Sequence, residues 1–190
     1  MSETKDRILT VGIDLFSKKG YHNVGLKEIL DKAEVPKGSF YYYFDSKEDF
    51  GVQVINKHSS IGLLDYKSFL EDKSLSPKNR IIKLHNSKID YFKHKECTEG
   101  CLMGNSSTEL SDVNESFRNV IALEFNLWQN ALEKCIIEGQ EAGEINKDIA
   151  SKMLASFILN SWEGALLRMK CEKTIDPLQD FVSGLKMILK

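Results

Sequence analysis

The stretch VPKGSFYYYFDSKEDF, from Val35 to Phe50, decides the fold of this chain. Pro36 cannot continue a preceding helix and is favoured at the start of the next one, so it indicates a tight turn. The residues that follow, about 37–43, predict a short helix. Asp45 and Ser46 then precede three charged residues, which is typical of a helix N-cap with an acidic first turn. The stretch therefore predicts a turn, a short helix and the start of another helix.

Two further helices are predicted on its N-terminal side. Apolar residues recur at helical spacing over about 3–19, and Gly20 follows two lysines, as is common at a helix C-terminus. A second short helix is predicted over about 26–33, where Leu26, Ile29 and Leu30 share one face. Two short helices joined by a turn at 34–36 form the outline of a helix-turn-helix.

The rest of the chain also has helical periodicity and contains few prolines. Further helices are predicted over about 47–64, 77–94, from near Cys101 onward, and over 115–143, 148–171 and 177–189. We therefore expect an all-α fold of about nine helices. The expected domains are a helix-turn-helix domain at 1–48 and a larger helical domain at 49–190.

The composition, 42% hydrophobic and 28% charged, is that of a globular protein. The net charge is −2, and residues 1–50 hold eight Lys and Arg against nine Asp and Glu. Binding to nucleic acid must therefore depend on where the cations stand rather than on their number. No N-terminal stretch resembles a signal peptide, and no apolar run approaches the roughly 18 residues of a membrane span. We expect a cytoplasmic protein that does not contact membranes and whose four cysteines are reduced.

Residues 8–50 as a whole resemble the N-terminal domain of the TetR/AcrR family of bacterial transcriptional regulators. The resemblance is carried by Val35–Phe50, Gly20-Tyr21, Glu28-Ile29 and Ala33. It implies a regulator, most often a repressor, that binds double-stranded operator DNA as a homodimer. It also implies that residues 49–190 bind a small-molecule effector and form the dimer.

The helix over about 37–43 is expected to enter the major groove, where base edges are read. Its lysine, serine and tyrosines suit base edges and phosphates, and its glycine allows close approach. Two more lysines stand at helix starts and are expected to bind backbone phosphate. The predicted contacts are Lys37, Gly38, Ser39, Tyr41 and Tyr42, with Lys27 and Lys47 on the phosphates. Phe40 and Phe44 are expected to face the core.

The dimer is expected to form through the last two helices, about 148–171 and 177–189. Small residues in the first of them permit close helix approach, and apolar residues supply area to bury. The small residues are Ala155, Ser156, Ser161, Gly164 and Ala165, and the apolar ones are Phe157, Ile158, Leu166, Leu167 and Met169. The alternative is that this helix belongs only to the core.

The segment GCLMGNSSTELS, residues 100–111, resembles a subset of the same family that includes NemR and AcuR. In some of that subset the matching cysteine responds to electrophiles or oxidants, and the residue here is Cys101. A position near a helix N-terminus lowers the pKa of a thiol and favours the reactive thiolate. Cys97, four residues earlier, is a candidate resolving thiol. An inert, structural Cys101 is the alternative.

The same half of the chain contains residues for two other kinds of site. A pocket for a non-covalently bound effector is predicted to be lined by Phe92, Met103, Asn105, Phe125, Trp128 and Trp162. A zinc site built from His94, Cys97 and Cys101, with His85 upstream, has loose spacing and lacks a matched second pair, so we expect neither a metal nor a cofactor.

A helical sequence of this kind also fits two other classes of protein. A helical enzyme is not expected, because the sequence has no paired catalytic carboxylates, no recognisable Ser/His/Asp set and no phosphate loop. A helical interaction protein that keeps the fold but has lost DNA binding stays open, because residues 1–50 carry slightly more acidic than basic side chains.

Overall fold

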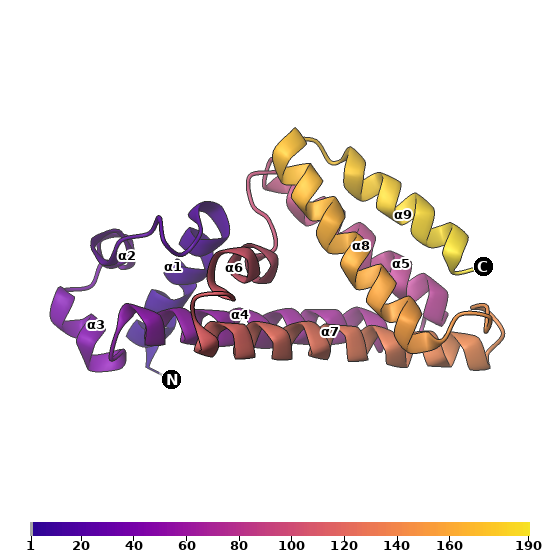
Figure 1. Ribbon diagram of the computed structural model, residues 1–190, viewed down its shortest axis with the longest axis horizontal. Helices are drawn as coiled ribbons and strands as arrows, with labels where there is room; N and C mark the ends of the chain where they lie inside the picture. Colours follow the sequence, from indigo (N-terminus) through magenta and orange to yellow (C-terminus); the bar gives the residue numbers. More distant parts are fainter. Residues whose placement is uncertain (1) are drawn as a thin grey trace. The chain divides into compact units, whose positions relative to one another are not determined.

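The chain is described by a computed structural model that covers residues 2–190 (Figure 1). Within that range every regular element is a helix, which confirms the all-α prediction. The helices are α1 (Glu3–Lys19), α2 (Leu26–Ala33), α3 (Lys37–Tyr43), α4 (Lys47–Leu70), α5 (Pro77–His94), α6 (Leu102–Leu110), α7 (Glu115–Glu141), α8 (Ser151–Glu172) and α9 (Asp176–Ile188).

Local signals set the ends of the first helices. Ser2 caps α1 by accepting a hydrogen bond from the Lys5 N–H at 3.2 Å, and Gly20 ends the helix at φ 79°. Pro36 occupies the N-cap of α3. Ser46 accepts the Asp49 N–H at 3.0 Å, so it caps α4 as the sequence predicted. Ser2 and Ser46 thereby satisfy N–H groups that a helix start would otherwise leave unpaired, whereas Pro36 fixes the start of α3 without a cap hydrogen bond.

The long helix α4 continues to Leu70, whereas the sequence predicted its end at about residue 64. The buried side chains of Tyr66 and Leu70 extend its apolar face through the added turn. The Leu70 carbonyl at its end accepts a hydrogen bond at 2.9 Å from the guanidinium of Arg80, which is buried. Tertiary contacts therefore stabilise the last turn, where the sequence shows no cap.

The chain divides into two compact units. The helix-turn-helix unit runs up to Ile61 and also includes Cys101–Glu124, and the C-terminal unit consists of Gly62–Gly100 and Phe125–Lys190. This division groups α6 and the first ten residues of α7 with the N-terminal helices, whereas the expectation from the sequence has a single boundary at 48/49.

An aromatic core supports the helix-turn-helix unit. Phe40 and Phe44, at and just after α3, are buried, as the sequence predicted, and their ring centroids lie 5.4 and 5.0 Å from that of Phe50 in α4. Phe16 of α1 joins the cluster at 5.8 Å from Phe50. Burial of four aromatic side chains is a large favourable contribution for so small a group of helices. The cluster fixes α3 with its opposite face directed outward.

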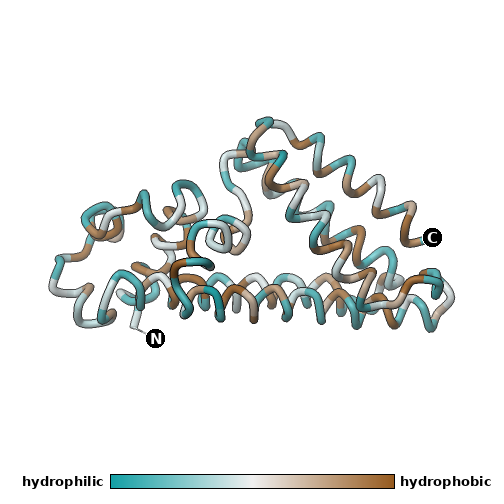
Figure 2. Tube along the Cα trace, in the orientation of Figure 1, coloured by the Kyte–Doolittle hydropathy of each residue, from teal (hydrophilic) through white to brown (hydrophobic). Residues whose placement is uncertain are grey.

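In the C-terminal unit, α9 packs beside α8 and α5. Figure 2 shows hydrophobic and hydrophilic positions alternating along α8 and α9. The inward positions of α8 include Ile158, Leu166 and Met169, which are buried within the unit. Among residues 2–190, no helix combines the length and apolar character needed to cross a bilayer.

Candidate nucleic-acid interface and effector sites

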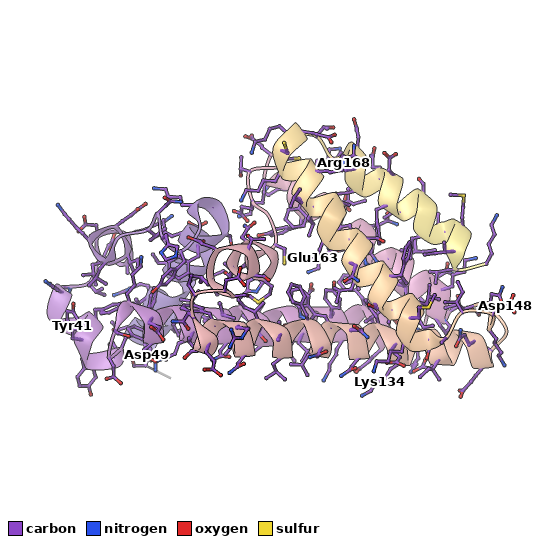
Figure 3. All side chains as sticks on the ribbon, in the orientation of Figure 1. Tyr41, Asp49, Lys134, Asp148, Glu163 and Arg168 are labelled. Carbon is purple, nitrogen blue, oxygen red and sulfur yellow. The ribbon has the colours of Figure 1, made fainter. Side chains whose placement is uncertain are left out.

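The outward face of α3 carries the residues that the sequence singled out for DNA. Tyr42 is 81% exposed and Tyr41, labelled on α3 in Figure 3, is 56% exposed. Lys37 and Gly38 are exposed, and Ser39 is half-buried at the edge of this face. A Cβ added to Gly38 would meet nothing within 4 Å, so the surface is low there. Two large aromatic side chains with polar ends, left in solvent on a short helix, are suited to contact DNA sugars and phosphates.

The lysines of residues 1–50 differ in whether they are paired. Lys32 pairs with Asp14 at 2.5 Å and Lys19 with Glu28 at 2.5 Å, so these lysines are engaged within the unit. Within the described part of the chain, neither Lys27 nor Lys37 forms an ion pair, and both are exposed. These two ammonium groups are therefore available to phosphate oxygens.

Lys47 lies differently from the other predicted phosphate contacts. Its Nζ donates a hydrogen bond to the Tyr21 carbonyl at 2.9 Å and lies 4.3 Å from the centroid of the Tyr21 ring. Partial burial lowers the pKa of Lys47, and the negative charge of Glu109 works against that shift. In this arrangement the ammonium group binds the protein itself, and its role as a phosphate contact stays a prediction.

Cys101 occupies the N-cap of α6, at the helix N-terminus where the sequence placed it. Its Sγ accepts a hydrogen bond from the Gly104 N–H at 3.4 Å, and the residue is partly exposed. Cys97 is buried, with its backbone at φ 54°. A sulfur that already accepts a backbone N–H at a helix N-terminus is in a position where a thiolate is stabilised.

The residues predicted to line an effector pocket fall in both units. Met103 and Asn105 belong to the helix-turn-helix unit, and the four aromatic residues, Phe92, Phe125, Trp128 and Trp162, belong to the C-terminal unit. Trp128 is buried and stacks on Tyr66, with ring centroids 5.5 Å apart. The indole N–H of Trp128 and the side-chain NH2 of Asn105 have no hydrogen-bond partner among residues 2–190. A buried donor without a partner is costly, so each is a candidate to meet an acceptor on a ligand.

Nowhere within residues 2–190 do three His, Cys, Asp or Glu side chains gather in a way that could hold a metal ion. His85, the upstream member of the zinc alternative, is instead packed between aromatic rings of α8 and α9. Its ring centroid lies 5.0 Å from those of both Trp162 and Phe181.

The faces of α8 and α9 that point away from the C-terminal unit carry exposed apolar side chains. Met153, Phe157 and Leu167 of α8 are 66%, 56% and 69% exposed, and Met187 of α9 is 64% exposed. Gly164 lies on the same stripe of α8, and a Cβ there would meet nothing within 4 Å. Figure 3 shows Glu163 and Arg168 on the same helix. Of the apolar residues predicted for the dimer, Phe157 and Leu167 are thus available, whereas Ile158, Leu166 and Met169 are buried within the unit.

One contact of the helix-turn-helix unit was not predicted. The carboxylate of Glu109 in α6 accepts hydrogen bonds from the backbone N–H groups of Tyr21 and His22, at 2.8 and 2.5 Å. Nothing in the local sequence around Glu109 indicates this contact, because the partners stand 88 and 87 positions away.

A short exposed helix that follows a tight turn, on an aromatic core, defines a DNA-binding protein of the helix-turn-helix class. Residues 8–52 match the family described as bacterial regulatory proteins, tetR family, and residues 77–185 match the tetracyclin repressor-like C-terminal domain. The chain belongs to the TetR family and is a DNA-binding transcriptional regulator.

Relatives and solved structures agree with this assignment. The HTH-type transcriptional repressor DhaR of Mycobacterium sp. (strain GP1) is 39% identical, over 94% of this chain and 88% of its own. Transcriptional regulator AcuR of Cereibacter sphaeroides is 36% identical, over 92% and 80%. A crystal structure of regulatory protein TetR from Rhodobacter sphaeroides has a TM-score of 0.95 at 31% identity and covers all of both chains. The reduced form of Escherichia coli NemR has a TM-score of 0.93 at 28% identity, over 100% and 98%.

Proposed function

We propose that this regulator is a repressor that binds operator DNA as a homodimer through α3 and leaves the DNA when its C-terminal half senses a small molecule or an electrophile. DNA binding is supported by the exposed face of α3. Lys37, Tyr41 and Tyr42 point into solvent there, while the opposite face of the helix packs on the buried aromatic core. DhaR and NemR, which are named as repressors, support the direction of regulation.

The contribution of each α3 residue follows from its chemistry. Lys37 donates to a guanine edge or a phosphate oxygen, and Ser39 donates to a base or phosphate. Tyr41 and Tyr42 bring hydroxyl groups to phosphate oxygens and ring surface to sugars and thymine methyl groups. Lys27, at the start of α2, adds a phosphate contact, which contributes affinity without sequence preference.

The test of the DNA contacts is binding of the purified protein to a duplex that the wild-type protein selects from a random pool. We expect Lys37→Ala with Tyr42→Ala to weaken binding by about two orders of magnitude, since each lost contact to a base or phosphate costs about 1–3 kcal/mol. Lys134→Ala, which removes an exposed lysine of α7 away from the proposed DNA contacts and dimer helices, is the control and should leave affinity unchanged. Undiminished affinity of the double variant would contradict the assignment of α3.

Dimerisation through α8 and α9 is supported by the exposed stripe on α8. Met153, Phe157, Gly164 and Leu167 recur at spacings of four, seven and three residues, which places them on one side of a helix. Glycine within a helix costs about 1 kcal/mol relative to alanine, and an exposed glycine such as Gly164 gains nothing from packing within the unit. A helix of a second subunit that lies close against this stripe would bury the apolar side chains and use the space at Gly164.

Sensing of an electrophile at Cys101 is supported by its place at the N-terminus of α6. The Gly104 N–H and the helix dipole stabilise negative charge on sulfur, and partial exposure gives a reagent access. Addition to an activated alkene joins the thiolate sulfur to one alkene carbon, while the C=C π bond breaks and the other carbon takes up a proton from water, so the negative charge at the helix cap is lost. The solved structure of the relative NemR is described as a reduced form.

The four thiols make this part testable in one experiment. At pH 8 we expect N-ethylmaleimide to label Cys101 faster than Cys135, because burial raises the pKa of Cys135 to about 11. Labelling of wild type should weaken DNA binding, and Cys101→Ser should abolish that response. Cys171→Ser is the control, since Cys171 is more exposed than Cys101 but lies at the C-terminal end of α8. Unchanged DNA release after Cys101→Ser would remove the electrophile proposal.

Non-covalent binding is the second mode of sensing that the structure supports. The unpartnered indole N–H of Trp128 is suited to donate to a hydrogen-bond acceptor of an effector. An effector that prefers the conformation with weak DNA affinity shifts the population by the difference between its affinities for the two states. Cys97 as a resolving thiol stays a prediction of the sequence.

A further inference from the structure

Glu109 stands at the end of α6 and directs both carboxylate oxygens at the turn between α1 and α2. Oε2 accepts the Tyr21 N–H at 2.8 Å, and Oε1 accepts the His22 N–H at 2.5 Å. Both bonds join a charged acceptor to backbone donors, which makes them stronger than bonds between neutral groups. The turn has no helical partners for these two N–H groups, so Glu109 satisfies donors that the local chain leaves open.

Gly20 leaves the space that the carboxylate occupies. A Cβ at Gly20 would lie 2.8 Å from Glu109 Oε2, closer than real Cβ contacts allow. The backbone at Gly20 also has φ 79° and ψ 168°, a region that is essentially restricted to glycine. Glycine at position 20 is therefore needed for two reasons. It adopts the backbone conformation of the turn, and its lack of a side chain leaves room for the Glu109 carboxylate.

The same turn is held from the other side by α4. Lys47 donates to the Tyr21 carbonyl at 2.9 Å, so both the N–H and the C=O of Tyr21 are bonded to side chains of other helices. The Tyr21 ring packs against Phe16 and Phe117 with centroids 5.3 and 5.1 Å apart. The turn is thus fixed relative to α4, α6 and α7 within the helix-turn-helix unit.

We propose that Glu109 is a positioning residue for DNA binding, which holds the turn at Gly20–His22 and thereby sets the direction in which α2 and α3 follow α1. Only three residues separate His22 from the first residue of α2, so a displacement of the turn is passed on to the helices that contact DNA. Glu109 itself does not contact DNA, and it acts through the backbone of Tyr21 and His22.

The position of Glu109 also links DNA binding to α6. This helix of nine residues has Cys101 at its N-cap and Glu109 as its penultimate residue. A shift of α6 that follows an adduct on Cys101 would move the carboxylate away from the turn. This link rests on the electrophile sensing proposed above, whereas the positioning role of Glu109 does not.

Charge alone and the positioning role predict opposite changes in DNA affinity when the Glu109 carboxylate is removed. Removal of a carboxylate from a DNA-binding unit lowers repulsion of the phosphates, so charge alone predicts tighter binding by Glu109→Ala. Loss of the held turn predicts weaker binding. Glu115→Ala is the matched control, because Glu115 is an exposed carboxylate of the same unit whose ion pair with Arg118 is long, at 3.9 Å.

The experiment measures binding of the selected duplex and the exchange rates of backbone amides, for full-length wild type, Glu109→Gln, Glu109→Ala and Glu115→Ala, well below their unfolding temperatures. We expect Glu109→Ala to weaken binding by about tenfold or more, since it removes two charge-assisted bonds. Glu109→Gln, which keeps one acceptor oxygen, should lie between it and wild type, and Glu115→Ala should bind as tightly as wild type or more tightly. The amides of Tyr21 and His22 should exchange faster in Glu109→Ala.

Three other outcomes would each overturn a different claim. Equal or tighter binding by Glu109→Ala would overturn the positioning role, even if the two amides exchange faster. A wild-type protein that selects no duplex would overturn the regulator function and the positioning role together. If alkylation of Cys101 weakens DNA binding by Glu109→Ala as much as it weakens binding by wild type, only the link through α6 is overturned.

Discussion

His85 is a buried histidine whose surroundings favour the neutral ring. It is 1% exposed, and its Nδ1 lies 2.8 Å from the Ile81 carbonyl, to which the neutral ring donates. Trp162 and Phe181 pack against it. Burial lowers the pKa of His85 to about 4, the hydrogen bond to Ile81 partly opposes that shift, and Lys88 adds to it. The histidine therefore stabilises the C-terminal unit as a packed ring rather than as a charge.

This pKa predicts how the free energy of unfolding depends on pH. The unfolded histidine, with a pKa near 6.5, takes up a proton before the folded one does. Stability should therefore be highest above about pH 6.5 and fall by up to about 3 kcal/mol as the pH drops towards 4. Denaturant unfolding of wild type and His85→Leu at several pH values tests this, because the variant should lack that part of the slope.

The control for His85 is His94→Leu, since His94 is exposed at the end of the same helix. It should unfold with the same pH dependence as wild type. If the free energy of unfolding falls equally steeply for wild type and His85→Leu between pH 6.5 and 4, the buried ring does not govern acid stability.

At the scale of the elements, α1 and α4 approach each other closely at Gly12. A Cβ at this position would lie 2.5 Å from Phe50 Cζ and 2.6 Å from Val54 Cγ2. Both side chains of α4 are fully buried, so neither can move aside freely. Glycine in the middle of α1, unfavourable by helix propensity, is therefore explained by tertiary packing.

We expect Gly12→Ala to destabilise the protein by about 1–3 kcal/mol, because the added methyl group overpacks the contact between α1 and α4. Gly38→Ala is a matched control, since it makes the same change on an exposed helix with nothing within 4 Å. Its stability should equal or exceed that of wild type, as alanine is the better helix former. Chemical denaturation of both variants gives the comparison, and a Gly12→Ala protein as stable as wild type would contradict the packing argument.

At the scale of the whole molecule, the proposed function depends on two copies, because one short recognition helix provides few base contacts. A two-fold dimer places the same patch of each subunit in contact, so residues of the exposed α8 stripe meet their own counterparts or near neighbours. Leu167 and Met187 contribute apolar area from both helices of the proposed interface. Removal of either from water is a gain only in the dimer.

Leu167→Glu should therefore break the dimer, because an intact interface would bury one carboxylate from each subunit among apolar side chains. Leu64→Glu is the matched control, because Leu64 on α4 has the same exposure of 69%. Sedimentation analysis should find Leu167→Glu monomeric where wild type and Leu64→Glu are dimers, and DNA affinity should fall with it. A dimeric Leu167→Glu would exclude this stripe from the interface.

Much of the fold follows from local sequence signals. The ends of α1, α3 and the start of α4 are set by Ser2, Gly20, Pro36 and Ser46, whose effects act over a few residues. The exposure of Tyr41 and Tyr42 beside the buried Phe40 follows from helical periodicity within one turn. The place of Cys101 at the start of α6 follows from the chain break at Gly100.

What the sequence by itself determined is thus the helical fold, the helix-turn-helix and the side chains that α3 presents. The tertiary structure alone decided which of these groups bind to the protein instead of to solvent. It turned Lys47 towards Tyr21, buried Ile158 and left Leu167 outside, and brought Glu109 to a turn 88 positions away. Caps and periodicity act between neighbours in the chain, whereas these contacts depend on how distant helices pack, and no short-range pattern encodes that.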